Sequence, residues 1–404
     1  MKSILAFLLG CIAHTCLAQH RIHGTVTENE KQTPVAGASV YINNSTIRTS
    51  TNSEGKYVLR LPAAGKYAIV IAAMGHELAS FETEADGEVR KNVVLNPKTV
   101  EIAEVTVSAY QKDGWKQWGT YFTESFIGTS AFAKQTKILN HEVLRFRYNA
   151  TDKVLQVFAM APLKISNRAL GYEITYALNA YQMDFNTRHL YYDGYAYFKE
   201  SKRVSSNVRR NREDAFASSL MRFTRSTYSK SWEKDGYTVR ELVRVVDNER
   251  LRIDSLMKKI NQRVFKDLQG NWTAFYRAQD EFNADSIQYF RAMLRKPKEY
   301  SLLKSKLNES QIMTAESTAA TKAIQYENYL HVKFSGATYE KSYFDWNSEA
   351  DGASLIKLSP HATVYIDALG NFSPAINWTH EGYWAWYNKI CTMLPLDYQS
   401  DSKP

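Results

Sequence analysis

Residues 51–77, TNSEGKYVLRLPAAGKYAIVIAAMGHE, are the most regularly patterned stretch of the chain and decide how its N-terminal part folds. Apolar side chains alternate with polar ones on both sides of a turn at Pro62–Gly65. The alternating apolar set is Tyr57, Leu59 and Leu61 before the turn, and Tyr67, Ile69 and Ile71 after it. A period of two is typical of strands with one buried face, so we expect a half-buried β-hairpin. This pattern predicts a scaffold and not a reactive site.

The composition and the first residues indicate a folded, exported protein. With 404 residues, 44% hydrophobic and 13% aromatic, the chain is long enough for two or three domains with ordinary cores. Lys2 precedes an apolar run, Ile4–Ile12, and then small residues up to Ala18, which is the pattern of a signal peptide over residues 1–18. We therefore expect the mature chain to begin at Gln19.

Cysteines and apolar runs limit what the mature chain can be. Residues 8–11, LLGC, leave lipidation of Cys11 open as an alternative, although the apolar core before the cut would then be short. No other stretch has the ~18 uninterrupted apolar residues of a membrane helix, so no transmembrane segment is expected after signal removal. Cys391 is the one cysteine beyond the leader, which excludes an intrachain disulfide and a cysteine zinc site.

The mature chain is moderately basic. Without Lys2 it has 50 Lys and Arg residues against 42 Asp and Glu residues, a formal charge of +8. Such an excess suits a glycan or an anionic surface such as lipopolysaccharide, but a distributed excess is more commonly a solubility feature. Nucleic acid is not an expected partner of an exported protein.

Residues 19–97 have the pattern of a small antiparallel β-sandwich, with turn residues about every ten positions. The motifs run in the order GTV (24–26), PVAGASV (34–40), TNSEGKYVL (51–59), GKYAIVI (65–71) and MGH (74–76). This ordered set resembles the carboxypeptidase regulatory-like domain, an all-β transthyretin-like sandwich common in exported proteins of Bacteroidota. The resemblance implies a noncatalytic module, found beside metallocarboxypeptidase domains and at the front of outer-membrane receptors.

The sequence lacks two common catalytic motifs. No histidine of the mature chain has a glutamate three residues on, as a metallocarboxypeptidase zinc site requires, and no G-x-S-x-G pentad offers a serine nucleophile. Thr51–Gly55 lacks the carboxylates of a calcium loop, which favours a hydrogen-bonded turn. We predict no metal, no cofactor and no catalytic residue. A glycosidase-type pair of carboxylates stays open, because a sequence does not show their separation.

The pattern changes after the sandwich. Residues 98–114 are expected to form a linker strand, and residues 115–404 one α+β domain of unknown function with a mainly antiparallel sheet and a helical portion at about 205–300. Large rings at positions 115, 118, 122 and 126 share one helical stripe. Alternation predicts strands over Tyr172–Leu178 and Leu190–Phe198, the latter with a bulge or turn at residues 193–194. We also expect helices at 206–226 and at Thr379–Leu394.

One candidate binding cluster in this domain is basic. Arg209, Arg210 and Arg212 lie at the expected start of the helix over residues 206–226, where cations oppose the helix dipole. They either pair with carboxylates such as Glu213 and Asp214 or bind an anion or an acidic partner.

The other candidate cluster is aromatic. Tyr191, Tyr195 and Tyr197 have rings with a polar tip, which serve sugar stacking and protein interfaces as well as ordinary cross-strand packing. Tyr195 and Tyr197 are predicted to share a face, and Tyr191 joins them if residues 193–194 add no extra position.

The sequence as a whole favours an exported, noncatalytic protein of the periplasm, the outer membrane or the cell surface. In this interpretation the sandwich is a spacer or docking module, and the α+β domain binds a protein partner at the outer membrane. A hydrolase on envelope glycans or peptides and a carbohydrate-binding module without turnover remain alternatives. Clustered ionisable groups with shifted pKa values would favour the enzyme, and a broad apolar or tyrosine-rich patch would favour binding.

Overall fold

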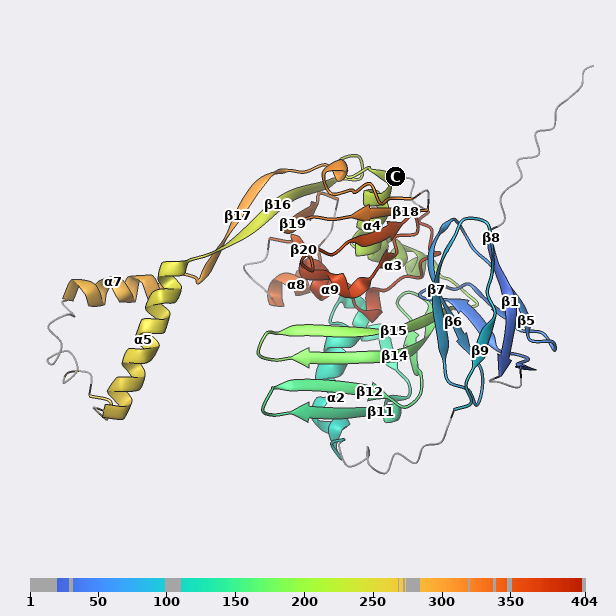
Figure 1. The fold of residues 1–404 in the computed structure, drawn as a ribbon, viewed down its shortest axis with the longest axis horizontal. Coiled ribbons are helices and arrows are strands. Elements are labelled where there is room, and N and C mark those ends of the chain that lie inside the picture. Colours follow the sequence, from blue (N-terminus) through green and yellow to red (C-terminus); the bar gives the residue numbers. More distant parts are fainter. Residues whose placement is uncertain are drawn as a thin grey trace, which may run out of the picture.

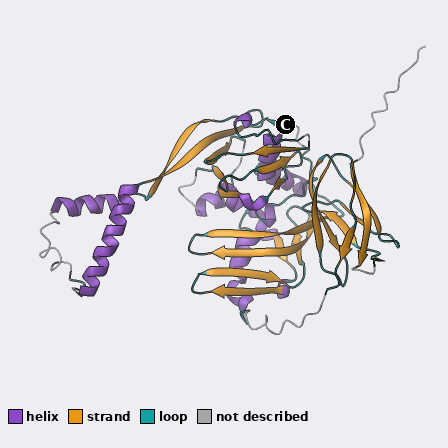
Figure 2. Ribbon diagram, in the orientation of Figure 1, coloured by secondary structure: helices purple, strands orange, loops and turns teal. Residues whose placement is uncertain are grey.

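A computed structural model describes residues 20–28, 32–98, 110–267, 269–271, 273, 284–318, 320–336, 339–346 and 351–401. It shows a β-sandwich (blue in Figure 1), a body of sheets and helices (green to red) and a long projecting arm (yellow to orange). The predicted order, a strand-rich N-terminal part followed by helices and antiparallel sheets, is confirmed (Figure 2). The signal peptide expected at 1–18, with Cys11, and residues 99–109 of the expected linker strand lie outside the described residues.

The N-terminal part is a sandwich of two sheets. In one sheet β1 is the central strand: β1 (Arg21–Glu28), β2 (Thr33–Pro34), β5 (Lys56–Arg60), β8 (Glu88–Arg90) and β9 (Val93–Leu95). The other sheet has the order β4 (Arg48–Ser50), β3 (Ser39–Ile42), β6 (Gly65–Ala72) and β7 (Ala79–Ala85). Both β8 and β9 run parallel to β1, so the expectation of a wholly antiparallel sandwich is wrong. Between β1 and β8 the chain passes through the other sheet. This long connection is the crossover that two parallel strands need.

Residues 51–77 are buried as predicted, but their two strands pair with other strands than expected. Its six alternating apolar side chains all lie in the sandwich core. The two strands do not form a hairpin, however, because β5 pairs with β1 whereas β6 pairs with β3 and β7. The turn after Leu61 therefore carries the chain from one sheet to the other. Alternation shows which face of a strand is buried and leaves open which strand is its neighbour.

Residues 114–200 form a six-stranded antiparallel sheet covered by helix α2 (Gly114–Phe126). Its order is β10-β13-β14-β12-β11, and β15 pairs with the other edge of β14. The strands are β10 (Thr136–Ile138), β11 (Leu144–Asn149), β12 (Val154–Ala159), β13 (Leu163–Asn167), β14 (Tyr172–Asp184) and β15 (His189–Glu200). The predicted aromatic stripe is confirmed, because Phe122 and Phe126 are buried and Trp115 and Trp118 pack on the same core.

The helix expected at 206–226 is two helices, α3 (Ser206–Ala217) and α4 (Leu220–Ser229). Ser219 separates them, because its hydroxyl accepts a hydrogen bond from the backbone N–H of Arg222 at 3.1 Å and caps α4. The portion expected to be helical, about 205–300, also contains strand β16 (Tyr237–Val246). Its second half, LVRVV, lacks the alternation that would have predicted a strand.

A second sheet of order β17-β16-β19-β20-β23 and a three-stranded sheet β18-β21-β22 complete the body. The elements are β17 (Glu299–Lys306), β18 (Thr321–Ile324), β19 (Tyr329–Phe334), α8 (Lys341–Trp346), β20 (Ser354–Leu358), β21 (Val364–Asp367), β22 (Phe372–Ser373), β23 (Trp378–Gly382) and α9 (Tyr383–Tyr387). The helix predicted at Thr379–Leu394 is wrong at both ends, since β23 pairs with β20 at its start and α9 ends at Tyr387. Gly382 (φ 71°) ends that strand where a Cβ atom would lie 2.4 Å from the carbonyl oxygen of Ala353.

The sandwich packs directly on the body through main-chain hydrogen bonds. The loop at residues 43–46 runs beside the open edge of β15 and forms a parallel bridge there. The backbone N–H of Asn44 donates to the carbonyl of Ala196 at 2.8 Å, and that of Phe198 donates to the carbonyl of Ser45 at 3.0 Å. The loop thus acts as a short additional strand of the second domain's sheet.

The C-terminal segment holds the same loop from the other side. The backbone N–H of Leu396 donates to the carbonyl of Asn44 at 2.7 Å. The carboxylate of Asp397 accepts hydrogen bonds from the hydroxyl of Thr46 and from its backbone N–H, the latter at 2.8 Å. Leu369 and Leu396 enter the hydrophobic core of the sandwich. The sandwich and the body therefore share one continuous packing unit.

We predict that Asp397→Ala loosens this junction. Removing the carboxylate leaves both donors of Thr46 without their partner, which costs about 1–3 kcal/mol. Hydrogen exchange of the amides at 43–46 should accelerate, and the thermal unfolding midpoint should fall. Asp401→Ala, at an exposed position nearby in sequence, is the control and should change neither measurement. Equal behaviour of the two variants would contradict the assignment.

Candidate interaction surface

The predicted tyrosine cluster lies on one face of β15. The strand runs through residues 193–194 without an insertion, and the extra residue of this hairpin is Asn179 on β14. Three side chains consequently point to the same side of the sheet: Tyr191, Tyr195 and Tyr197. Tyr192 lies on the opposite face and packs against the core. The condition under which Tyr191 joins the other two is therefore met.

Two of these tyrosines contact the sandwich. The hydroxyl of Tyr195 is hydrogen-bonded to the hydroxyl of Ser80 at 2.6 Å. The ring of Tyr197 meets the ring of Tyr41 edge-on, with 5.6 Å between centroids, and the guanidinium of Arg48 lies 5.2 Å from its centre. Their polar tips and ring faces are thus used within the chain, at the junction of its two parts.

The structure separates the three arginines of the basic cluster. Arg212 is 7% exposed and lies over the ring of Tyr172 at 4.1 Å. It donates to the carboxylate of Glu200 at 2.5 Å and to the carbonyl of Leu170 at 2.8 Å, which joins α3 to the end of β15. Its carboxylate partner is therefore on β15 and is neither Glu213 nor Asp214. Arg209 and Arg210 are exposed on the outer side of α3.

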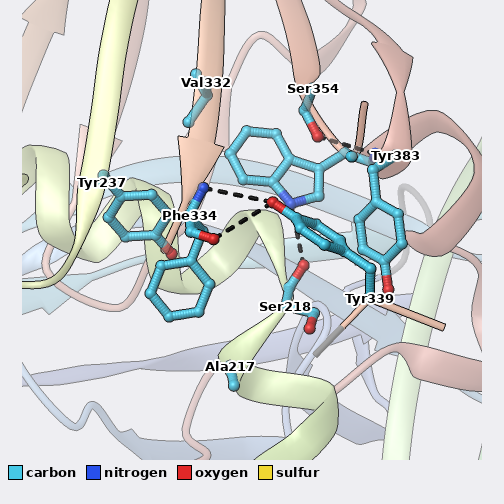
Figure 3. Close-up of a pocket in the computed structure, with 10 residues that line it drawn as sticks. Ala217, Ser218, Tyr237, Val332, Phe334, Tyr339, Ser354 and Tyr383 are labelled. Atoms are coloured by element: carbon cyan, nitrogen blue, oxygen red, sulfur yellow. Dashed lines mark hydrogen bonds between the residues drawn. The ribbon is translucent and has the colours of Figure 1, made fainter. Parts of the chain in front are cut away.

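Two cavities in the described part of the chain are small. One is lined by the rings of Tyr237, Phe334, Tyr339 and Tyr383 and has a volume of about 10 Å³ (Figure 3). The other, at the junction with the sandwich, has a volume of about 20 Å³, and burial raises the pKa of its Asp367 to about 6. Small-molecule sites are typically ~300–1,000 Å³. Each of these cavities has room for about one water molecule.

Buried ionisable groups occur near the end of the body. Burial lowers the pKa of Lys389 to about 8 and raises the pKa of Cys391 to about 11. The thiol of Cys391 lies 3.3 Å from the hydroxyl of Ser130, and the ammonium of Lys389 lies 5.6 Å from the ring centre of Tyr192. These groups pack against one another and line neither cavity. Among the described residues no group of three or more His, Cys, Asp or Glu side chains is arranged to hold a metal ion.

The feature that stands out from the body is the arm, which we define as residues 243–306. It consists of the ends of β16 and β17 with helices α5 (Asn248–Asp267) and α7 (Ala284–Arg295) at its tip (Figure 1). Pairing of β16 with β19 stops at Leu242, whereas pairing with β17 continues to Val246. From residue 243 the arm is a two-stranded ribbon. Such a ribbon alone is marginally stable in water.

The arm exposes an unusual amount of apolar surface. Fourteen large hydrophobic side chains are exposed among the residues that the structure describes, and seven of them are on the arm. They are Val246, Leu251, Phe265, Tyr289, Tyr300, Leu302 and Leu303. Phe265 is 70% exposed, and Tyr300 and Leu302 are 47% and 48% exposed. Apolar surface gathered in this way marks an interaction site more often than a solvent face.

The arm is also basic. Residues 243–306 include 14 Lys and Arg against 8 Asp and Glu, whereas the whole chain has 51 against 42. The formal net charge of the arm is therefore +6. The sequence did not predict the arm as a candidate site, because the excess charge reads as distributed along the chain. A count of charge along the sequence does not single out the arm either, because residues 199–234 have the same net charge of +6.

Arg244 anchors the base of the ribbon. Its guanidinium donates to the hydroxyl of Tyr329 on β19 at 2.9 Å and forms a bidentate pair with the carboxylate of Glu381 on β23. It also lies 4.3 Å from the ring centre of Tyr329 and 3.8 Å from the carboxylate of Glu299 on β17. One side chain thus joins four strands at the point where the arm leaves the body.

We predict that Arg244→Ala loosens the arm at its base. Loss of the bidentate pair and of the hydrogen bond to Tyr329 should lower the opening free energy of the ribbon by roughly 1–2 kcal/mol, seen as faster hydrogen exchange in β16 and β17. The control is Arg252→Ala, whose pair with Glu249 on α5 is exposed to solvent, so its loss should accelerate exchange much less. The same acceleration in both variants would show that Arg244 has no special role.

Asp254 on α5 links this helix to the segment between α7 and β17. It accepts hydrogen bonds from Lys298 at 3.0 Å and from Arg250 at 3.2 Å, and these bonds lower the pKa of Asp254 to about 2. Arg250 also donates to the carbonyls of Leu294 and Lys296 at 3.1 Å each, at the C-terminal end of α7. A cation is favourable there, because the carbonyls that end a helix lack intrahelical partners.

We predict that acid loosens the helical tip. The pKa of Asp254 is lowered in the folded state, so its pairs stabilise the tip above the ordinary value of 3.8, and this stabilisation is lost as the pH falls through about 2. Hydrogen exchange in α5 should accelerate between those pH values relative to the body. In Asp254→Asn the tip should exchange faster at neutral pH and show a smaller acid transition. An unchanged transition in that variant would contradict the role of Asp254.

The comparison with protein families identifies the sandwich. Residues 22–107 match the family model of the CarboxypepD_reg-like domain, which confirms the resemblance seen in the sequence motifs. The sandwich is therefore a domain of this kind, and the body and the arm lie outside the match. No curated protein matches the chain. Among the residues that the structure describes, no helix is both long and apolar enough to cross a bilayer.

Solved structures resemble the chain only distantly. A type II cohesin–X-dockerin complex from Acetivibrio cellulolyticus is 17% identical, with 19% of this chain and 56% of that chain covered and a TM-score of 0.17. A group B streptococcus pilus 2b backbone protein is 16% identical over 20% of this chain and 42% of that chain (TM-score 0.18). A protein of unknown function from Bacteroides fragilis is 9% identical over 86% and 92% (TM-score 0.16). The chain thus spans about half of the first structure, and scores this low support no argument.

Proposed function

We propose that this chain is an exported, noncatalytic protein of the cell envelope that binds a protein partner through its arm. The observation that carries the proposal is the arm's share of exposed apolar side chains, seven of the fourteen in the described part of the chain. The location, in the periplasm or at the outer membrane, rests on the leader pattern at residues 1–18 and on the family of the sandwich.

The sandwich and the body support the arm in this proposal. The sandwich is hydrogen-bonded to β15, and the body holds the base of the ribbon through Arg244. The arm is therefore presented in a fixed direction. A preoriented element loses less conformational entropy on binding than a free segment does.

The side chains of the arm favour a protein over a carbohydrate. Sugar sites use aromatic rings together with polar groups, whereas the exposed ribbon combines aliphatic side chains such as Leu302 and Leu303 with one tyrosine ring, Tyr300. Two of the three tyrosines that could have formed a sugar platform, Tyr195 and Tyr197, contact the sandwich instead.

The test is affinity capture from an envelope extract with the mature protein and a double variant, Tyr300→Ser with Leu302→Ser. We expect one stoichiometric protein with the wild type and at least about tenfold lower recovery with the variant, as for central interface residues. The control changes two similarly exposed residues of the sandwich, Val58→Ser with Val94→Ser, and should leave recovery unchanged. Equal recovery with the arm variant, or enrichment of glycan alone, would overturn the proposal.

A further inference from the structure

We infer that the open edge of β17 is a docking site for an extended acidic segment of the partner protein, which adds a strand to the ribbon. This inference rests on the proposed function and names the chemistry of its partner. β17 is the terminal strand of its sheet, and all eight of its residues are exposed. Unpaired backbone groups along such an edge are a template for another strand.

The hydrogen-bond pattern shows which backbone groups are available. The backbone N–H of Asp247 donates to the carbonyl of Lys298 at 2.9 Å, so these opposite residues form a hydrogen-bonded pair. Such pairs alternate along an antiparallel ladder with pairs whose N–H and C=O groups point outward. Because Lys298 is in a hydrogen-bonded pair, the residue after it is not, and the two kinds of pair alternate from there. Glu299, Ser301 and Leu303 therefore point their backbone N–H and C=O groups away from β16. An added strand would bond to them.

The side chains beside this edge suit an apolar and acidic partner. Val243, Val245, Tyr300 and Leu302 share one face of the ribbon, because Val243 pairs with Leu302 and Val245 pairs with Tyr300. An added strand would cover the outer flank of this face. Two exposed cations at the ends of β17 have no ion pair among the described residues: Lys296, three residues before the strand, and Lys306, its last residue. Acidic side chains on the partner would neutralise them.

Charge disfavours a second copy of this chain as the occupant. Two copies of β17 paired about Ser301 would place Lys298 opposite Lys304 and Lys296 opposite Lys306, and like charges directly opposite destabilise a sheet. Pairing about Leu303 would instead place lysines opposite Tyr300 and Leu302. The lysines thus protect the edge from self-association and leave it open to a strand of opposite charge.

The test measures binding of two short synthetic peptides, one of alternating glutamate and valine and one with lysine in place of glutamate. The glutamate peptide should bind the mature protein at least about tenfold more tightly than the lysine peptide. Ser301→Pro removes an outward N–H that β16 does not use and should weaken binding about tenfold, since proline is tolerated at an open edge. Ser301→Ala keeps that N–H and should bind like the wild type.

A charge-reversed variant, Lys296→Glu with Lys306→Glu, keeps the backbone of the ribbon and should prefer the lysine peptide. Equal binding of the two peptides, or no effect of Ser301→Pro in a folded protein, would overturn the inference. Binding to phosphatidylglycerol vesicles that follows the lysines but ignores Ser301→Pro would assign the edge to a lipid surface. If Ser301→Pro has no effect while Tyr300→Ser with Leu302→Ser still abolishes partner capture, strand addition fails and the proposed function stands.

Discussion

The main-chain hydrogen bonds between residues 43–46 and β15 are the contact on which the arrangement of the molecule depends. An uncovered sheet edge presents backbone groups that must be bonded, protected or left to water. The sandwich loop covers the edge of β15, and Asp397 and Leu396 then hold the loop in place. The same problem arises at β17, where the described structure provides no covering segment. One edge is thus used to assemble the chain, and the other is left for a partner.

The burial of individual side chains could be predicted from the sequence better than their pairing. Within residues 51–77 every alternating apolar residue is buried, yet β5 and β6 belong to different sheets. The reason is that alternation depends on the local environment of one strand, whereas pairing depends on segments far apart in the chain. The aromatic residues of the predicted last helix follow the same rule. Tyr383 and Trp386 are buried as a helical stripe would be, although the pairing of β23 with β20 decides where the helix begins.

The candidate residues illustrate what a sequence lacks. The shared face of Tyr195 and Tyr197 follows from periodicity, but their contacts with Ser80 and Tyr41 join segments more than a hundred residues apart. Pairing with a carboxylate was one of two alternatives for Arg212, and the carboxylate that it meets lies on β15, outside its own helix. The arm was not predicted, because the feature that distinguishes it is the exposure of its apolar side chains. Exposure is a property of the whole fold, and local patterns contain it only indirectly.

The way the arm is held explains how it can keep apolar side chains exposed. A ribbon of two strands cannot form a core of its own, so its position must be fixed by other interactions. Arg244 at the base and Asp254 at the tip supply them through charged hydrogen bonds that reach several elements at once. These polar contacts leave Tyr300 and Leu302 available at the surface of the ribbon. A partner strand would bury them without first displacing an internal contact, and this makes the ribbon suited to strand addition.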